Sequence, residues 1–311
     1  MLSILRREIS GYFDSMMGFG VIGAFVTIMM LLSVMLDPFG GGGNWFDRGE
    51  LSMRTFFGIF PWVAAVVIPA VSMRLWSDDR RQGTFEMLMT LPIPTWKVAM
   101  AKYFAGVAFF VLMLCGTLFY PVMLMYFGTP DWGPIIGGYV ACLLLGMAFI
   151  AIGMFVSGLT ENQALSFFLA MMLCLALVGM GELRGELGTL ARENTQAATV
   201  HVISVPLVGL AMLTAAVTKD RGMAVFTGIV AVLANAGIYL VDNPEPVAGQ
   251  VLEANAYSEG VIATLSQVSV LAHFNEIQRG VMNTEGLMFF ATLIVLFVLL
   301  NVWSLESRRY N

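Results

Sequence analysis

The glycines at positions 18, 20 and 23 form the pattern G-x-G-x-x-G, whose backbone can cradle the phosphates of a dinucleotide. That chemistry requires a strand before the pattern and a helix that opens on it. Here the pattern lies within an uncharged apolar run, so we interpret it as small residues that let helices pack closely. The sequence contains no P-loop motif, no G-x-S-x-G and no H-E-x-x-H, so it offers neither a P-loop for ATP nor a recognisable hydrolase site.

Cysteine and histidine, the other residue types that carry chemistry, are few and scattered. Cys115, Cys142 and Cys174 all fall within apolar runs, which favours buried or lipid-facing side chains over a disulfide framework. His201 and His273 have no acidic or thiol partner at metal-ligand spacing. We therefore expect no metal, no cofactor and no catalytic residue in this chain.

The composition explains why chemistry-bearing residues are rare. The 311 residues are 58% hydrophobic and only 12% charged, with a mean hydropathy of +0.81. Soluble globular chains are about 25% charged. The balance excludes a disordered chain and argues against a soluble enzyme, because a water-facing surface needs more polar residues than this chain has.

Eight uncharged runs are long enough to cross a membrane, which takes about 20 residues of helix. They cover approximately Met16–Leu36, Thr55–Met73, Tyr103–Phe127, Pro134–Gly158, Asn162–Gly181, Val200–Thr218, Gly222–Val241 and Leu287–Trp303. The sequence therefore predicts an all-α, polytopic membrane protein of about eight transmembrane helices, folded as one transmembrane domain over residues 1–311. Six helices are the alternative if the pair between 200 and 241 does not span.

Charge sets the expected orientation, since cytoplasmic loops are enriched in Lys and Arg. With both termini in the cytoplasm, eleven of the 16 basic residues and eight of the 21 acidic residues lie inside. The outer basic residues are then Arg48, Arg54, Arg184, Arg192 and Arg279. The inner face carries +3 and the outer face −8, whereas the inverted topology would violate the rule.

Several segments outside the spans are patterned as helices. Apolar residues repeat every three to four positions near the N-terminus, which predicts an interfacial helix within 1–15 rather than a plain extension of the first span. Segments 182–199 and 242–286 show similar spacing and are expected to be amphipathic outer-surface helices before the last span. The sequence does not decide whether these two segments form a structural cover over the helix bundle or a functional surface.

The segment 74–102 is the most informative cytoplasmic loop. We expect Ser77-Asp78-Asp79 to cap a helix, Gly83 to break it, and Thr84 to cap a second short helix with Glu86 in its first turn. Pro92 then ends that helix. A short helix that projects on the cytoplasmic side suits docking on a soluble partner, and a plain solvated loop is the alternative.

The predicted spans contain no Asp, Glu, Lys or Arg. Ionisable residues within a membrane normally mark proton or ion pathways, so their absence argues against a proton-coupled carrier. We expect Asn235 and Asn301 to bond between helices. Pro121 and Pro206 are expected to kink their spans.

Three blocks of sequence resemble the ABC-2 type permease subunits of ABC transporters, and within them the gliding-motility GldF-like and NosY-like group. They are RREISGYFDSMMGF, then RLWSDDRRQGTFEMLMTLPIPTWKVAMAKYFAG, and finally LAHFNEIQRGVMNTEGLMFF with the terminal LESRRY. The second block is similar to the family pattern R-x-x-G-T-x-E-x-L-x-T-x-P. The extra apolar pair near 200–241 and the glycine-rich loop at 37–54 depart from the family pattern.

The resemblance implies a non-enzymatic permease of a bacterial inner-membrane exporter, which works with a separate ATP-binding ABC ATPase subunit and a second permease copy or paralogue. It implies that the ATPase-coupling loop includes Arg80, Gly83, Thr84 and Glu86. It also implies an outer gate, or a contact with a periplasmic auxiliary subunit, at His273, Phe274 and Gly280.

Other partners and functions follow less directly. Membrane lipid is an expected partner and nucleic acid is not. The alternatives are an ion-coupled secondary carrier or channel, and a membrane scaffold of a motility or maturation complex.

Overall fold

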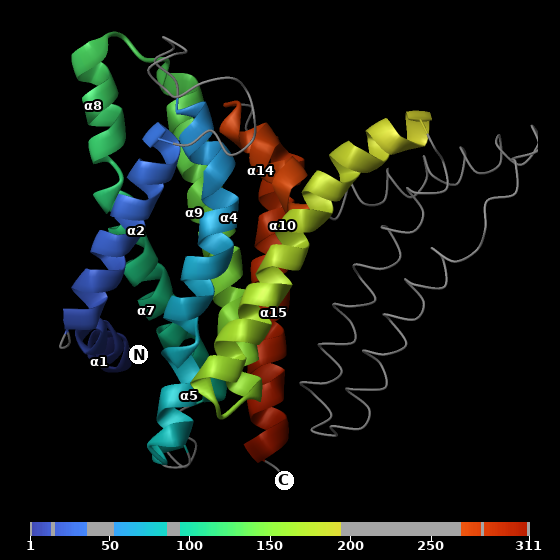
Figure 1. Ribbon diagram of the computed structural model, residues 1–311. Coiled ribbons are helices and arrows are strands. Elements are labelled where there is room, and N and C mark those ends of the chain that lie inside the picture. The colour runs from blue at the N-terminus through green and yellow to red at the C-terminus, as the bar shows by residue number, and fades with distance from the viewer. Residues whose placement is uncertain are drawn as a thin grey trace, which may run out of the picture. The chain divides into compact units, whose positions relative to one another are not determined.

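The computed structural model describes residues 2–13, 16–35, 53–85, 94–193, 269–280 and 283–309, and the regular structure in these ranges is helical. The helices are α1 (Leu2–Phe13), α2 (Met16–Met35), α4 (Arg54–Ser72), α5 (Arg74–Arg81), α7 (Thr95–Gly116), α8 (Phe119–Phe127), α9 (Trp132–Leu159), α10 (Gln163–Glu193), α14 (Val270–Gln278) and α15 (Thr284–Arg309). The predicted all-α class is confirmed for these ranges (Figure 1).

Within the described residues, five helices are long and apolar enough to cross a membrane, and a sixth is added if the bent pair α1–α2 is one span. Each of the six coincides with one of the predicted apolar runs, so the polytopic helical character is confirmed. The predicted pair Val200–Thr218 and Gly222–Val241 lies outside the described residues, and so does the prediction of eight spans rather than six.

The chain divides into two compact units, residues 1–171 with 273–311, and residues 172–272. The second unit is described only for the latter part of α10 and for residues 269–272. There, Gly181 of α10 allows a close approach, because a Cβ at this position would lie 2.9 Å from the Ser269 hydroxyl. The candidate sites described below all belong to the first unit.

Helix α9 forms the core of the first unit. Every residue from Ala148 to Met154 is buried, as expected for a helix that is apolar on all sides and surrounded by other helices. Helices α4 and α15 pack along it, and α7 contacts it as well (Figure 1). The predicted bond of Asn301 is confirmed, because its side-chain amide donates to the Met154 carbonyl at 3.0 Å from α15.

The outer surface of this unit is apolar. Phe119, Val122, Met288 and Trp303 are each more than 60% exposed. Exposed apolar side chains in such numbers would be unfavourable in water and are ordinary against lipid tails. This surface supports the membrane location inferred from composition.

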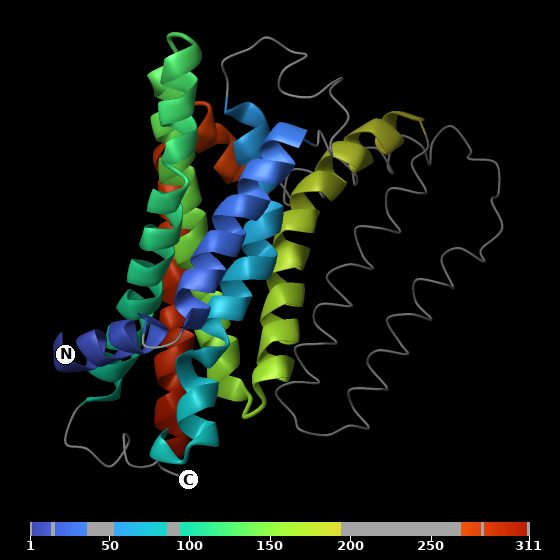
Figure 2. The ribbon, with the colours of Figure 1, turned by 60° about the vertical axis from the view of Figure 1, so that its left-hand side comes forward.

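Helix α1 runs crosswise to α2 and packs against the side of α7 (Figure 2). Its axis meets that of α2 at 71°. Tyr12 of α1 stacks on Phe109 of α7 with ring centroids 4.6 Å apart, and Phe13 also contacts that ring. A helix within 1–15 is therefore confirmed, and its aromatic face packs against α7, whereas its position in a membrane interface stays a prediction.

The glycine pattern at the start of α2 does not pack as expected. Gly18 lies against the Tyr12 carbonyl, but no described atom would come within 4 Å of a Cβ at Gly20 or Gly23. The interpretation of the pattern as close helix packing is therefore wrong for Gly20 and Gly23 among the described residues. Both face outward on α2, because the buried side of that helix is set by Phe25 and Met29.

Helix α5 extends α4 through Met73, so that one apolar helix runs from Arg54 to Arg81. The expected cap at Ser77-Asp78-Asp79 is wrong, since these residues lie within α5 and the Ser77 hydroxyl bonds back to the Met73 carbonyl. Helix α7 likewise begins at Thr95, before the predicted Tyr103. The expected loop 74–102 therefore begins later and ends earlier than predicted, and residues 86–93 between the two helices lie outside the described residues.

The predicted proline kink at Pro121 is visible as the break between α7 and α8. Proline lacks the N–H that would bond the carbonyl of Thr117, four residues earlier. That carbonyl accepts instead from the Tyr139 hydroxyl of α9 at 3.1 Å and from the Tyr120 amide at 3.0 Å. A side chain from the neighbouring helix thus satisfies a carbonyl exposed within an apolar region.

Replacing Tyr139 by phenylalanine should lower the free energy of unfolding in detergent by about 0.5–1.5 kcal/mol, the usual value of one hydrogen bond. Chemical denaturation followed by circular dichroism measures the change. The double variant with Pro121→Ala should lose less than the two single changes combined, because alanine restores an amide donor for the Thr117 carbonyl. Strict additivity would contradict this account.

The predicted outer helices are partly described. Residues 182–193 continue α10 directly, so the helix there extends the fifth span instead of starting separately. Helix α14 confirms a helix before the last span, and the remainder of the segment 242–286 before Ser269 lies outside the described residues.

Candidate functional site

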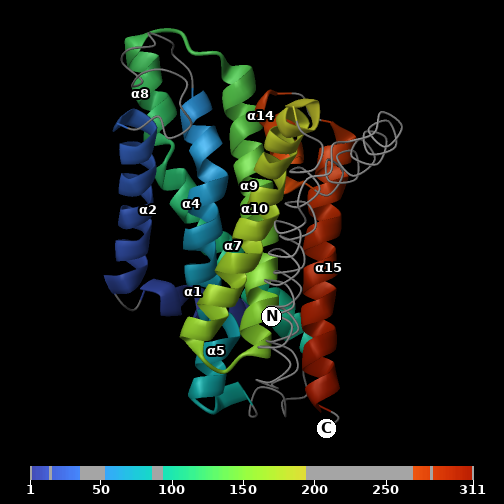
Figure 3. The same ribbon diagram turned by 45° about the vertical axis from the view of Figure 1, so that its right-hand side comes forward.

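A buried ionic cluster lies where α1, α5 and α7 meet. The same end of the first unit holds the first and the last of the described residues (Figures 1 and 3). The Lys102 ammonium of α7 is 3.0 Å from a carboxylate oxygen of Glu8 and 2.6 Å from one of Asp79. Lys102 is only 2% exposed, and each carboxylate side chain is 16% exposed. A lone ammonium at this depth would be strongly unfavourable, so the two carboxylates are what allows its burial.

Aromatic rings connect this cluster to the end of α5. The Lys102 ammonium lies 5.1 Å from the centre of the buried Trp76 ring, within the range of a cation–π interaction. Trp76 contacts Phe85 edge to face at 5.9 Å, and the Arg80 guanidinium lies 4.7 Å from the centre of the Phe85 ring. The cluster therefore reaches Phe85, where the described part of this segment ends.

The turn after α5 brings three of the four predicted coupling residues together. Gly83 has a φ of +70°, a left-handed conformation that favours glycine, and its amide donates to the Arg80 carbonyl at 3.2 Å. The expected helix break at Gly83 is thus confirmed. The Thr84 hydroxyl bonds back to an Asp79 carboxylate oxygen at 3.1 Å. Glu86 and most of the short helix expected after Thr84 lie outside the described residues.

The other side of α5 is fixed by hydrogen bonds to the end of α9 and the start of α10. The Ser157 hydroxyl accepts from the Trp76 and Ser77 amides at 3.1 and 3.2 Å and donates to the Met73 carbonyl at 2.7 Å. The Gln163 amide donates to the Asp78 carboxylate. Helix α5, which precedes the turn at Gly83, is therefore fixed on one side by the ion pair with Lys102 and on the other by these hydrogen bonds.

Sequence reasoning missed the members of this cluster that lie farthest from the turn. Lys102 carries a visible signal, because it is a single charge placed one residue before an apolar run of a predicted span. Glu8 carries none, because it lies 94 positions away along the chain. Only the packing of α1 against α7 shows that the two residues form a pair.

The predicted outer residues lie on α14 and in the turn that follows it, and each has different neighbours. Phe274 is buried and stacks on Phe60 of α4, with ring centroids 6.3 Å apart and planes 2° from parallel. His273 lies 4.4 Å from the Phe289 ring of α15. Gly280 adopts a φ of +81° and its amide donates to the Ile277 carbonyl at 3.0 Å.

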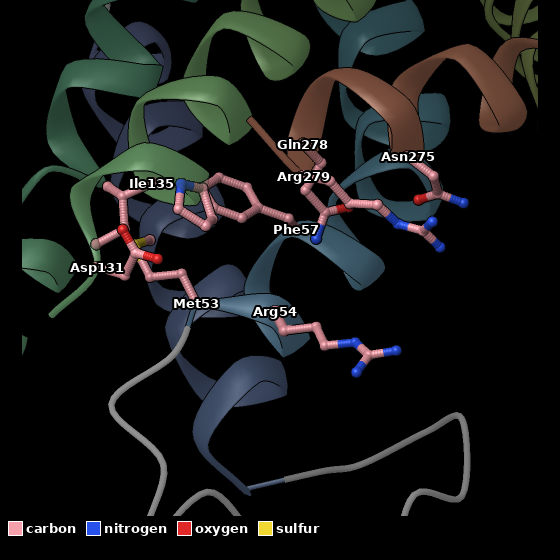
Figure 4. A pocket seen from close by; sticks show the side chains of 9 residues that line it. Met53, Arg54, Phe57, Asp131, Ile135, Asn275, Gln278 and Arg279 are labelled. Atoms are coloured by element: carbon pink, nitrogen blue, oxygen red, sulfur yellow. The ribbon is translucent and has the colours of Figure 1, made fainter. Parts of the chain in front are cut away.

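A pocket with a volume of about 610 Å³ opens beside these residues, at the end of α4 opposite to α5 (Figure 4). It is lined by Met53, Arg54, Phe57, Asp131, Pro134, Ile135, Asn275, Gln278 and Arg279. None of the three predicted outer residues lines it, although Arg279 immediately precedes Gly280. The predicted topology places both Arg54 and Arg279 on the outer side, but their positions, 225 residues apart in the sequence, gave no sign of a shared site.

Comparison with known proteins gives one result. The model of the family described as ABC-2 family transporter protein matches residues 51–219, just over half of the chain. The match includes α4, α5, α7 and α9, and therefore Trp76, Asp79 and Lys102 of the ionic cluster. No curated protein and no solved structure matches the chain. Its apolar helices and this match over most of the bundle show that the chain belongs to the ABC-2 transporter family, whose members are generally non-catalytic membrane components that work with an ABC ATPase.

Proposed function

We propose that the chain is the membrane-spanning permease subunit of an ABC exporter, and that a separate ABC ATPase docks on the segment around Arg80, Gly83, Thr84 and Glu86. The observation that carries this proposal is the ionic link between Lys102, Glu8 and Asp79. It connects the turn at Gly83 to two other helices. A displacement of this turn would therefore be transmitted to α4 through α5, and to α1 and α7 through Lys102.

The orientation proposed with this function places both termini and the ionic cluster in the cytoplasm. The distribution of Lys and Arg supports it, because eleven of 16 lie on that side of the predicted topology. A bacterial inner membrane, a second permease copy or paralogue, and the GldF-like and NosY-like group belong to the same proposal. So does a periplasmic auxiliary subunit near His273, Phe274 and Gly280.

Co-expression with the ABC ATPase encoded nearest to this gene tests the docking assignment. The wild-type chain should co-purify with the ATPase and stimulate ATP hydrolysis in nanodiscs. Glu86→Arg should weaken the complex at least about tenfold, since reversing one interfacial charge typically costs more than about 1.4 kcal/mol. Gly83→Pro should also weaken it, because proline cannot adopt the φ of +70° or donate to the Arg80 carbonyl.

Glu306→Arg serves as the matched control, because Glu306 is an exposed acidic residue near the end of α15. It should insert, purify and stimulate like the wild type. Normal stimulation by Glu86→Arg and Gly83→Pro would show that the ATPase docks elsewhere. Transport by the chain alone in proteoliposomes, driven by an ion gradient, would instead support a secondary carrier.

A further inference from the structure

Two buried polar groups of complementary kind lie in α5 and in the last turns of α15, at the same end of the first unit (Figures 1 and 2). The indole N–H of Trp76 is a donor, and the side-chain oxygen of Asn301 is an acceptor. Both side chains are 0% exposed, and within the described part of the chain neither atom has a hydrogen-bond partner. Buried polar atoms are nearly always bonded to protein or to ordered water, so this pair requires an explanation.

Other contacts hold both side chains in place. The amide nitrogen of Asn301 donates to the Met154 carbonyl at 3.0 Å, which leaves the side-chain oxygen as the atom to be satisfied. The Trp76 backbone amide donates to the Ser157 hydroxyl at 3.1 Å, and its ring lies 5.1 Å from the Lys102 ammonium. Turning either side chain toward another partner would break these contacts.

Both side chains approach the same point beside Gly158, in the last turn of α9. A Cβ at Gly158 would lie 3.7 Å from Trp76 Cδ1, the ring carbon bonded to the indole nitrogen, and 3.1 Å from Asn301 Nδ2. Beyond α9 itself, no other described atom comes within 4 Å of that position. Because a water oxygen forms hydrogen bonds at about 2.7–3.2 Å, one molecule near this point can reach both polar atoms.

We propose that one water molecule is bound between Trp76 and Asn301, beside Gly158. It accepts from the indole N–H and donates to the Asn301 oxygen. The final carbonyl groups of a helix lack amide partners within it, so the last turn of α9 offers an acceptor for the second hydrogen. A buried water with two to four polar partners is a regular part of protein structure. This molecule connects α5 to α15, two helices that each pack on α9.

Nuclear magnetic resonance of the full-length chain, with 15N-labelled indole groups and in an uncharged maltoside detergent, tests the proposal. The chain has six tryptophans, and the indole signal that disappears in Trp76→Phe belongs to Trp76. In the wild type this signal should show a rotating-frame Overhauser cross-peak to water, of opposite sign to the diagonal, which distinguishes proximity from proton exchange. If Trp76→Phe does not purify, changing the other five tryptophans one at a time assigns the signal by elimination.

Three variants locate the water. Gly158→Ala should abolish the cross-peak, because the added methyl group takes the place of the water. Gly58→Ala adds the same group to α4 where no described atom would lie within 4 Å, so the cross-peak should stay. Asn301→Leu keeps the size of the side chain but removes its oxygen, and it should weaken the cross-peak about fivefold, the usual effect of one lost hydrogen bond on an equilibrium.

Unfolding in urea gives a second readout. The double variant Trp76→Phe/Asn301→Leu should lose less stability than the two single changes combined, because both changes remove the same bridge.

The possible outcomes are distinct. A Trp76 signal without contact to water overturns the proposal, and a shift of that signal in Asn301→Leu would then show that the indole bonds to Asn301 directly. A cross-peak that survives both Gly158→Ala and Asn301→Leu also overturns it, because the water would then lie elsewhere. No ATPase is present, so these results are independent of the docking experiment.

Discussion

Replacing Lys102 by methionine is expected to lower the free energy of unfolding in detergent by about 3–5 kcal/mol, because it leaves two largely buried carboxylates without their shared cation. Glu8 and Asp79 each place an oxygen within 3.0 Å of the Lys102 ammonium. Methionine fills a similar volume and keeps the contact with the Trp76 ring, so lost packing contributes little. Thermal and urea unfolding followed by circular dichroism measure the difference.

Two controls isolate the charge effect. Lys97→Met on the same helix changes an exposed lysine and should stay within about 0.5 kcal/mol of the wild type. The triple variant Glu8→Gln/Asp79→Asn/Lys102→Met should recover most of the loss, because the charge left without its partner, that of Arg7, is 58% exposed to solvent. A Lys102→Met variant as stable as the wild type would show that the cluster contributes nothing to the fold.

Changing Gly146 to alanine should destabilise the bundle by about 1–3 kcal/mol, the usual range for inserting a methyl group into a packed core. The new Cβ would overlap the ring of Phe110, with Cδ1 only 2.8 Å away. That ring is 1% exposed and packs against Phe60, so it has little room to move. The effect is measured by the same unfolding experiments.

Gly23 offers the matched control within the described residues, since no described atom would lie within 4 Å of its Cβ. Gly23→Ala should keep or raise stability, by up to about 1 kcal/mol, because alanine favours a helix more than glycine does. Equal effects at Gly146 and Gly23 would contradict the close packing of α7 on α9. A loss at Gly23 alone would reveal a contact that α2 makes with another molecule.

The spans could be predicted because each is a long uncharged run, and a backbone in lipid must satisfy its own hydrogen bonds as a helix. The helix ends were less predictable. Arg74–Arg81 is polar and follows a span, which suggested a loop with its own cap, yet α5 continues α4 because Ser157 and Gln163 hold it there. Tertiary hydrogen bonds of this kind leave no local pattern in the sequence.

The residues of the candidate sites also differ in how well the sequence predicts them. Gly83 was predictable, because a glycine after a polar helical segment often marks its end. The pair of Glu8 with Lys102 and the joint placement of Arg54 with Arg279 depend on helices far apart in sequence. Without contacts between elements, these residues are only isolated charges beside apolar runs.

The continuity of α4 and α5 has a thermodynamic consequence. The helix that begins at Arg54 and ends at Arg81 has 28 residues and a length of about 42 Å at 1.5 Å per residue. Its first residue lines the outer pocket, and its last turn carries Arg80. Any ligand that favours one tilt or bend of this helix, for example at Pro61 or Pro69, biases the position of the other end. Linkage is reciprocal, so a molecule that binds near Arg54 and a protein that binds near Arg80, when both favour one bend of this helix, change the affinity of each other by the same factor.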